Sequence, residues 1–192
     1  MFALSSMIAI LLLVDDVRLI VLWFLSQVFL KLETTMKIEQ YERVTKQAIA
    51  LIESEKDLIA NLSNLSALLN MELDDINWVG FYLVRNEDLV LGPFQGKPAC
   101  VRIPIGKGVC GVAVEQNSVQ RVSDVHQFEG HIACDAASNS EIVIPFYIDG
   151  CIAGVLDIDS PVLSRFGEID EQGLTFLMSE VEKLFNSHAI SA

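Results

Sequence analysis

Residues 141–160 read EIVIPFYIDGCIAGVLDIDS, and this stretch constrains the fold more than any other part of the chain. Two runs rich in β-branched and aromatic residues flank Asp149-Gly150, the residue pair that a tight hairpin turn prefers. The pattern therefore predicts two antiparallel strands joined by a two-residue turn.

The segments around this hairpin indicate an α+β domain. Apolar residues recur at three- and four-residue steps in the segments 34–55, 57–73 and 168–185, which predicts three helices, each with one apolar stripe. Further strand patterns and one short helix lie between them; the expected strands are 76–84, 89–94, 100–105 and 119–125, and the expected short helix is 106–117. Helices before and after a set of antiparallel strands indicate a sheet with helices packed on one face.

The two faces of the predicted sheet differ in character, because alternate residues of a strand share a face. One face of the segments 76–84 and 154–160 is aliphatic and suits packing against helices. The other face carries two aromatic residues with polar tips and two carboxylates, namely Trp78, Tyr82, Asp157 and Asp159. Without further evidence, the two aromatic residues would be interpreted as packing residues and the two acids as solvated residues of an exposed strand. The polar loops 92–99 and 123–140 are long enough to fold over this face, which predicts the floor of a pocket.

Four cysteines are present, at Cys100, Cys110, Cys134 and Cys151. The chain is long and apolar enough to need no disulfide framework, and none of the cysteines forms a CxxC pair. A zinc site built from His126, His131, Cys134 and one more thiol matches no common structural spacing. We therefore expect no metal ion and no cofactor, and we interpret the histidines as solvated loop residues.

The charge balance bears on the partners of the chain. Its 26 acidic and 13 basic residues give a formal net charge of −13, which argues against nucleic acid, because phosphate backbones require clustered Lys and Arg. The segment 106–117 also lacks the GK[ST] ending of a phosphate-binding loop.

The first 33 residues differ in composition from the rest of the chain. Two apolar runs are interrupted by Asp15, Asp16 and Arg18, so each run is too short to cross a bilayer and one continuous span would be costly. No small-residue cleavage site follows them. The segment is either membrane-associated or an upstream stretch foreign to the native protein, with Met36 as the true start; we favour the second interpretation. We expect residues 1–33 to be an extension and residues 34–192 to be one domain.

Cys134 lies among small and acidic residues, where carboxylates disfavour a thiolate. Such a thiol suits a substrate that must itself be protonated, and a sulfoxide is such a substrate. Its oxygen takes a proton, the thiol attacks its sulfur, and the sulfenic acid left on the cysteine is resolved by another thiol. Two carboxylates shielded from water cannot both ionise cheaply, so one becomes a general acid near neutral pH. The same acids can hold a substrate ammonium group.

Four stretches, taken together and in order, closely resemble the free methionine-(R)-sulfoxide reductases, which are GAF-fold enzymes. These stretches are INWVGFYL, LVLGPFQGKPACVRIPIGKGVCG, HIACDAASNSEIVIP and GVLDIDS. The resemblance runs from about Met36 to about Leu184. It implies a central six-stranded antiparallel sheet with helices packed on one face. It also implies an oxidoreductase that reduces free methionine (R)-sulfoxide to methionine.

The resemblance also implies roles for individual residues. Cys134 corresponds to the attacking thiol, Cys100 to the resolving partner that closes a disulfide, and Cys110 to a thiol that can stand in or relay. The substrate-binding acids correspond to Glu141, Asp157 and Asp159, and the aromatic wall around the methyl-sulfoxide end corresponds to Trp78 and Tyr82. Cys151 matches no family role, and we interpret it as a packing or partly exposed thiol.

The implied partners are free methionine (R)-sulfoxide and a thioredoxin-like reductant that reopens the disulfide. A compartment that keeps thiols reduced favours a cytoplasmic protein, and the family suggests a homodimer. A non-catalytic GAF module that senses a small molecule or redox state is the alternative, although such modules usually accompany an output domain. A scaffold tethered to a membrane through residues 1–32 is a third interpretation.

Overall fold

The computed structural model describes residues 2–130, 132 and 136–189. The chain divides into two compact units, Met1–Glu39 and Gln40–Ala192. Helix α1 (Phe2–Ile52) supplies the first unit and the first residues of the second. Within the described residues, the structure contains no helix with the length and apolarity needed to cross a membrane.

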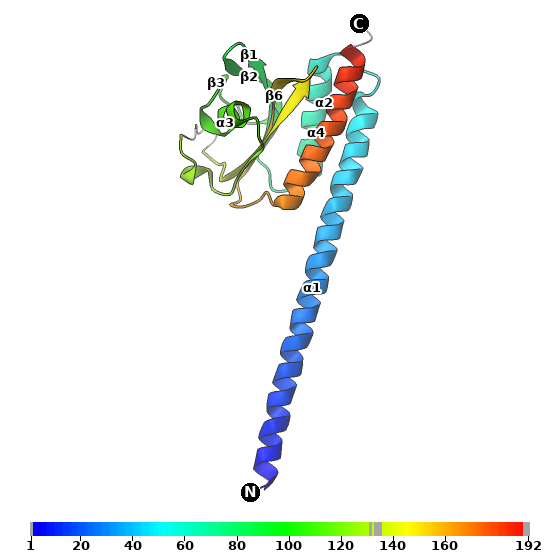
Figure 1. The fold of residues 1–192 in the computed structure, drawn as a ribbon, viewed down its shortest axis with the longest axis vertical. Coiled ribbons are helices and arrows are strands. Elements are labelled where there is room, and N and C mark those ends of the chain that lie inside the picture. The colour runs from blue at the N-terminus through cyan, green and yellow to red at the C-terminus, as the bar shows by residue number, and fades with distance from the viewer. Residues whose placement is uncertain (1, 131, 133–135, 190–192) are drawn as a thin grey trace. The chain divides into compact units, whose positions relative to one another are not determined.

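The second unit is built on an antiparallel sheet, coloured green to yellow in Figure 1. Its strands run in the order β3-β2-β1-β6-β5-β4, with six strands among the described residues. Their bounds are β1 (Trp78–Arg85), β2 (Asp88–Gly96), β3 (Arg102–Pro104), β4 (Gln120–Val122), β5 (Ser140–Ile148) and β6 (Cys151–Ser160). The predicted six-stranded antiparallel sheet is thereby confirmed.

The hairpin at the centre of the prediction is β5 and β6. Asp149 and Gly150 connect the strands with φ values of 52° and 74°. Both values are positive, as a type I′ turn requires. Strand β6 pairs with β5 on one side and with β1 on the other, so it places its alternating residues in the middle of the sheet.

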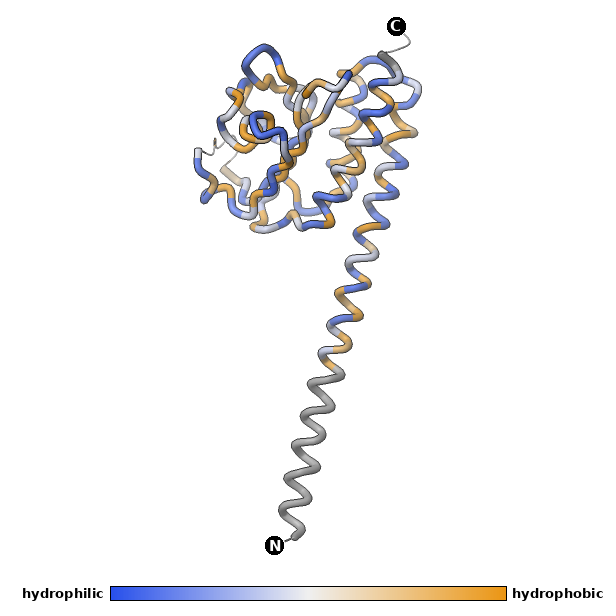
Figure 2. Tube along the Cα trace, viewed as in Figure 1, coloured by the Kyte–Doolittle hydropathy of each residue, from blue (hydrophilic) through white to orange (hydrophobic). Residues whose placement is uncertain are grey.

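Two further helices cover one face of the sheet, together with residues 40–52 of α1. They are α2 (Leu58–Glu72) and α4 (Glu168–Ala189), and Figure 1 shows both on the same side. The side chain of Asp57 caps α2 by accepting a hydrogen bond from the backbone N–H of Ala60 at 2.9 Å. Along α4, hydrophilic and hydrophobic residues alternate with the turns of the helix (Figure 2), as expected of a helix with one buried side.

The core between these helices and the sheet consists of aliphatic and aromatic side chains. Phe81, Leu156 and Ile158 point into it from the strands and are fully buried. Leu65 and Val181 meet them from α2 and α4. The expected alternation of β1 and β6 is therefore observed, with the aliphatic residues facing the helices.

The opposite face carries a smaller cluster and the short helix α3 (Gly108–Gln116). Trp78 and Phe94 stack on this face with ring centroids 5.3 Å apart. Gly80 lies directly opposite Phe94 in the sheet, and a Cβ atom at this position would come within 2.3 Å of the Cβ of Phe94. A glycine is therefore required at residue 80 for β1 and β2 to approach so closely.

One expectation about a loop is wrong in part. The segment 92–99 was predicted to be a polar loop, but β2 continues to Gly96. The register between β1 and β2 shifts between Gly80 and Tyr82, where β2 carries Gly92 and Pro93. Proline is tolerated in a sheet at such irregularities, so the strand resumes beyond it.

Candidate active site

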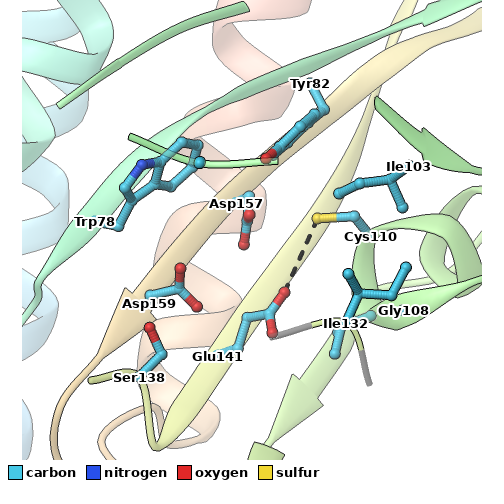
Figure 3. Close-up of a pocket in the computed structure, with 12 residues that line it drawn as sticks. Trp78, Tyr82, Ile103, Gly108, Cys110, Ile132, Ser138, Glu141, Asp157 and Asp159 are labelled. Carbon is cyan, nitrogen blue, oxygen red and sulfur yellow. Dashed lines mark hydrogen bonds between the residues drawn. The ribbon is translucent and has the colours of Figure 1, made fainter. Parts of the chain in front are cut away.

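A pocket lies on the face of the sheet opposite α2 and α4. Strand residues form its floor and α3 forms one side (Figure 3). Residues of the connection after β2 and of the segment that leads into β5 complete it. Its lining residues are Trp78, Tyr82, Ala99, Ile103, Gly108, Val109, Cys110, Ile132, Ser138, Glu141, Asp157 and Asp159. Among these described residues none is Lys, Arg or His, so the pocket combines carboxylates, a thiol and aromatic rings.

The register of the sheet explains why three of these residues meet. Asp159 on β6 lies opposite Trp78 on β1 and opposite Glu141 on β5. Directly opposed residues of antiparallel strands place their side chains on the same face. The row Trp78–Asp159–Glu141 therefore crosses three strands, and Asp157 lies two residues along β6 on the same face.

Trp78 and Tyr82 form an aromatic wall with ring centroids 5.9 Å apart. Both rings are almost fully buried. Each also holds the segment after β2: the indole N–H of Trp78 donates to the backbone oxygen of Lys97 at 3.2 Å, and the hydroxyl of Tyr82 donates to the backbone oxygen of Cys100 at 2.9 Å. The wall thus fixes the backbone that carries one of the redox-candidate cysteines.

Glu141 and Asp157 are buried carboxyl groups, each 6 % exposed, and Asp159 is half-buried. Burial, together with the nearby charges of Asp157 and Asp159, raises the pKa of Glu141 well above its ordinary value. Burial also raises the pKa of Asp157, to about 6. Both shifts favour the protonated carboxylic acid, which suits these groups to donate a proton near neutral pH.

Cys110 lies in the first turn of α3, and its thiol faces the carboxylates. Its Sγ atom is 3.9 Å from Oε1 of Glu141, the contact drawn as a dashed line in Figure 3. Burial, reinforced by the charges of Asp157 and Glu141, raises the pKa of this thiol. Cys110 is therefore a protonated thiol in this state, which makes it a poor nucleophile.

The other cysteines are found in different environments. Cys100 is disulfide-bonded and partly buried. Cys151, interpreted from the sequence as a packing or partly exposed thiol, is an exposed free thiol at the start of β6 and does not line the pocket. Cys134 lies outside the described residues, whereas Ile132, two residues before it in the sequence, lines the pocket.

Comparison with known proteins identifies the family. The free methionine-R-sulfoxide reductase of Escherichia coli is 58% identical over 148 residues, which cover 77% of this chain and 90% of that protein. The chain belongs to the free methionine-R-sulfoxide reductase family.

Solved structures of this reductase family also match the chain. A structure described as fRMsr of Staphylococcus aureus in complex with substrate is 58% identical, with a TM-score of 0.73, and covers 76% of this chain and 95% of its own. The Neisseria meningitidis free methionine-R-sulfoxide reductase in complex with its substrate is 42% identical, with a TM-score of 0.77, and covers 81% of this chain and 94% of its own. No protein-family model matches the chain.

Most of the site residues expected from the sequence of this reductase are gathered in one pocket. Figure 3 shows the carboxyl groups of Glu141, Asp157 and Asp159 directed into one space, with Trp78 and Tyr82 along one side of it. The two acids on β6 are thus not solvated residues of an exposed strand.

The apolar side of the pocket was not predicted from the sequence. Ile103 and Val109 are buried there, and Ala99 and Ile132 are partly buried. No periodic signal marks these residues, because each comes from a short element or a loop. Only the neighbourhood of Cys100, Cys110 and Cys134 in the sequence could have pointed to them.

The zinc arrangement considered for the histidines gains no support from the described residues. His126 is exposed, and its Nε2 atom lies 3.0 Å from Oδ1 of Asn139. His126 is therefore solvated as interpreted, although it lies in the 3-10 helix η1 (Val125–Gln127) and not in a loop. His131 and Cys134 lie outside the described part of the chain.

Proposed function

We propose that this chain reduces free methionine (R)-sulfoxide to methionine by a cycle of thiol, sulfenic acid and disulfide. The sulfoxide oxygen takes a proton, and the sulfur of Cys134 attacks the sulfoxide sulfur. The oxygen is transferred to Cys134 as a sulfenic acid, and methionine leaves. The thiol of Cys100 then displaces water from the sulfenic acid and closes a disulfide, while Cys110 serves as the alternative thiol.

The buried acids of the pocket are the observation that carries this proposal. Glu141 lies within the pocket, its raised pKa favours the protonated form, and it donates the proton to the sulfoxide oxygen. Asp157 and Asp159 share one face of β6 within the pocket, and their negative charge attracts the ammonium group of a free amino acid. A peptide-bound methionine lacks this ammonium group, so the acids also select the free amino acid.

The aromatic wall of Trp78 and Tyr82 is a suitable binding surface for the methyl-sulfoxide end of the substrate. Trp78 and Tyr82 present apolar ring surface beside the acids, and a thioether end of a substrate packs well against aromatic rings. The substrate is therefore held by charge at one end and by ring contacts at the other.

The state of the cysteines agrees with the proposed order of thiols. Cys100 is disulfide-bonded, whereas Cys110 and Cys151 are free thiols. A thioredoxin-like dithiol reopens the disulfide and accepts the oxidation, which makes the next turnover possible. This requirement favours the cytoplasm, where thiols are kept reduced. A homodimer is also part of the proposal, because resemblance to the family suggests it.

An assay with both epimers of methionine sulfoxide, each free and within a peptide, tests the proposal. We expect thioredoxin-dependent consumption of the free R epimer only. Cys134→Ser should abolish turnover, and Cys151→Ser, which changes an exposed thiol outside the pocket, serves as the matched control and should leave it unchanged.

Two outcomes would contradict the proposal. Normal turnover of Cys134→Ser would exclude the assigned nucleophile. Tight binding of the sulfoxide without its consumption would instead favour the alternative, a GAF module that senses the ligand. Disulfide mapping by mass spectrometry after exposure to substrate would identify the resolving cysteine.

A further inference from the structure

The pocket contains a group of three side chains with the composition of a metal site. One ligand atom from each of Cys110, Glu141 and Asp157 lies within 4.8 Å of the other two. Cys110 is 3 % exposed and the two acids are 6 % exposed each. The residues come from three separate elements, α3, β5 and β6, which fix their relative positions.

A second observation points to a cation among these residues. The Oδ1 atom of Asp157 is buried and has no hydrogen-bond partner among the described residues. Buried carboxylates are normally paired, hydrogen-bonded or bound to a metal, since an uncompensated buried charge is costly. The pocket therefore offers an unpartnered carboxylate oxygen next to a thiol and a second carboxylate.

We propose that Cys110, Glu141 and Asp157 bind a Zn²⁺ ion when no substrate occupies the pocket. The mixture of one sulfur and two oxygen ligands suits zinc, whereas Mg²⁺ and Ca²⁺ prefer oxygen ligands throughout and in larger number. The remaining tetrahedral corner faces the pocket and is completed by water.

The geometry requires only small side-chain movements. In a tetrahedral zinc site, sulfur and oxygen ligands lie about 3.5 Å apart. The Sγ atom of Cys110 and the Oε1 atom of Glu141 are already 3.9 Å apart. The third ligand, Asp157, approaches by rotation about its side-chain torsions. Metal ligands are deprotonated, so the thiol of Cys110 and the carboxylic acid of Glu141 both release their protons to solvent as the metal binds.

The consequence is inhibition, and this part of the inference rests on the proposed function. Zinc would occupy the space in which Asp157 and Glu141 receive the substrate, and it would withdraw Cys110 from the thiol cycle. Zinc and free methionine (R)-sulfoxide therefore compete for one pocket. Release of the metal would make a resting protein available for turnover.

Metal titration of the purified full chain tests the site without any sulfoxide. The protein is kept free of reductant, so that Cys100 stays disulfide-bonded, and is titrated with Co²⁺ as a coloured substitute for Zn²⁺. We expect one metal per chain and a thiolate-to-cobalt absorption band that Zn²⁺ removes. Cys110→Ser should abolish the band, and Asp157→Asn should keep it while weakening binding by about tenfold or more.

The matched control and the contradicting outcomes separate this site from other thiols. Cys151→Ser changes the other free thiol and should leave the band and the affinity unaltered. A band that persists in Cys110→Ser, a band that is lost in Cys151→Ser, or no saturable binding up to about 1 mM metal would overturn the proposal. If Cys110→Ser does not fold, Glu141→Gln takes its place and should weaken the affinity as Asp157→Asn does; an unchanged affinity would overturn the proposal.

Competition distinguishes failure of the zinc site from failure of the proposed function. Free methionine (R)-sulfoxide should raise the apparent Kd for Zn²⁺ as its concentration rises, and the S epimer should not. A chain that reduces the sulfoxide yet binds no zinc refutes the metal site alone. A chain that binds zinc through Cys110 yet never consumes the sulfoxide refutes the proposed function and leaves the metal site intact.

Discussion

On the face of the sheet toward α2 and α4, Leu156 and Ile158 are fully buried among aliphatic and aromatic side chains. On the opposite face the next residue of the same strand in each case is a carboxylate, and Asp157 is buried almost as completely. Along strand β6, burial of the aliphatic residues stabilises the fold, whereas burial of the carboxylates between them lowers its stability.

The contrast between the two faces explains how the fold tolerates a pocket of buried carboxyl groups. Burial of Leu156, Ile158 and their neighbours supplies the favourable free energy. Burial of Glu141 and Asp157 opposes it, as their raised pKa values show. We expect substitutions on the helix face to lower stability with little change in chemistry, and substitutions on the pocket face to lower activity with little or no loss of stability.

The largest effect should follow loss of the proton donor on the pocket face. Glu141→Gln keeps the size of the side chain but removes the carboxylic acid, so we expect kcat/KM for free methionine (R)-sulfoxide to fall by about 10²- to 10⁴-fold. The melting temperature should stay equal to that of the parent or rise. Glu42→Gln, at an exposed residue of α1, is the control and should change neither quantity. Loss of activity through unfolding would contradict the comparison.

The second effect concerns the helix face. Leu156→Ala leaves a cavity beside Phe81 in the core, and we expect the free energy of unfolding to fall by about 3 kcal/mol. Chemical denaturation measures this change. Below the melting transition, kcat/KM should stay within a few-fold of the parent value. Leu163→Ala is the matched control, because Leu163 is 56 % exposed, and it should cost far less stability.

The sequence predicted the central hairpin and the two faces of β1 and β6 because these features depend on local signals. The Asp149-Gly150 pair specifies the turn, and side chains alternate regularly along a strand. Trp78 and Asp159 could thus be assigned to the polar face of their strands from this alternation alone. Their direct opposition across β1 and β6 required the strand register, which local patterns do not specify.

Long-range contacts were beyond the reach of the sequence patterns. Cys110 and Glu141 are 31 residues apart, and they meet only because α3 crosses the pocket face of the sheet. Resemblance to the family indicated that both residues matter. It did not indicate that they would touch, nor that Tyr82 would hold the backbone of Cys100. The predicted strand 89–94 included Pro93 but ended two residues before β2 does, because glycine, found at residue 96, is a poor strand residue.

The third effect is a gain in stability from a change on the pocket face. The pKa of Asp157 is raised in the folded protein to about 6, from an ordinary value of 3.8, because the group is buried. The folded state therefore binds more protons than the unfolded state between these values, so this group lowers the stability as pH rises from about 4 to about 6. Asp157→Asn should remove that decline and stabilise the protein by about 3 kcal/mol at pH 7, with no gain at pH 4.

Thermal melting of parent and variant at several pH values measures the difference. Asp149→Asn is the matched control, since Asp149 lies in the exposed hairpin turn, and its melting curve should follow the parent at each pH. An Asp157→Asn variant less stable than the parent at pH 7 would show that this carboxylate stabilises the fold. The two faces would then not differ as described.

The smallest effect tests whether the aromatic wall acts on the substrate or on the resolving thiol. Tyr82→Phe keeps the ring but removes the hydroxyl that donates to the backbone oxygen of Cys100, so we expect about 1 kcal/mol less stability. Disulfide closure should slow by a few-fold, because Cys100 is less firmly placed. Release of methionine in a single turnover should keep its rate, since the ring still faces the substrate.

Rapid quenching after mixing with the sulfoxide separates these two steps. Tyr147→Phe is the matched control, because its hydroxyl contacts Asn117, far from Cys100 in the sequence and outside the pocket lining. Slower methionine release in Tyr82→Phe, with disulfide closure unchanged, would assign the hydroxyl to the substrate instead. The pocket face would then act through direct contact alone, without a part in holding the segment that carries Cys100.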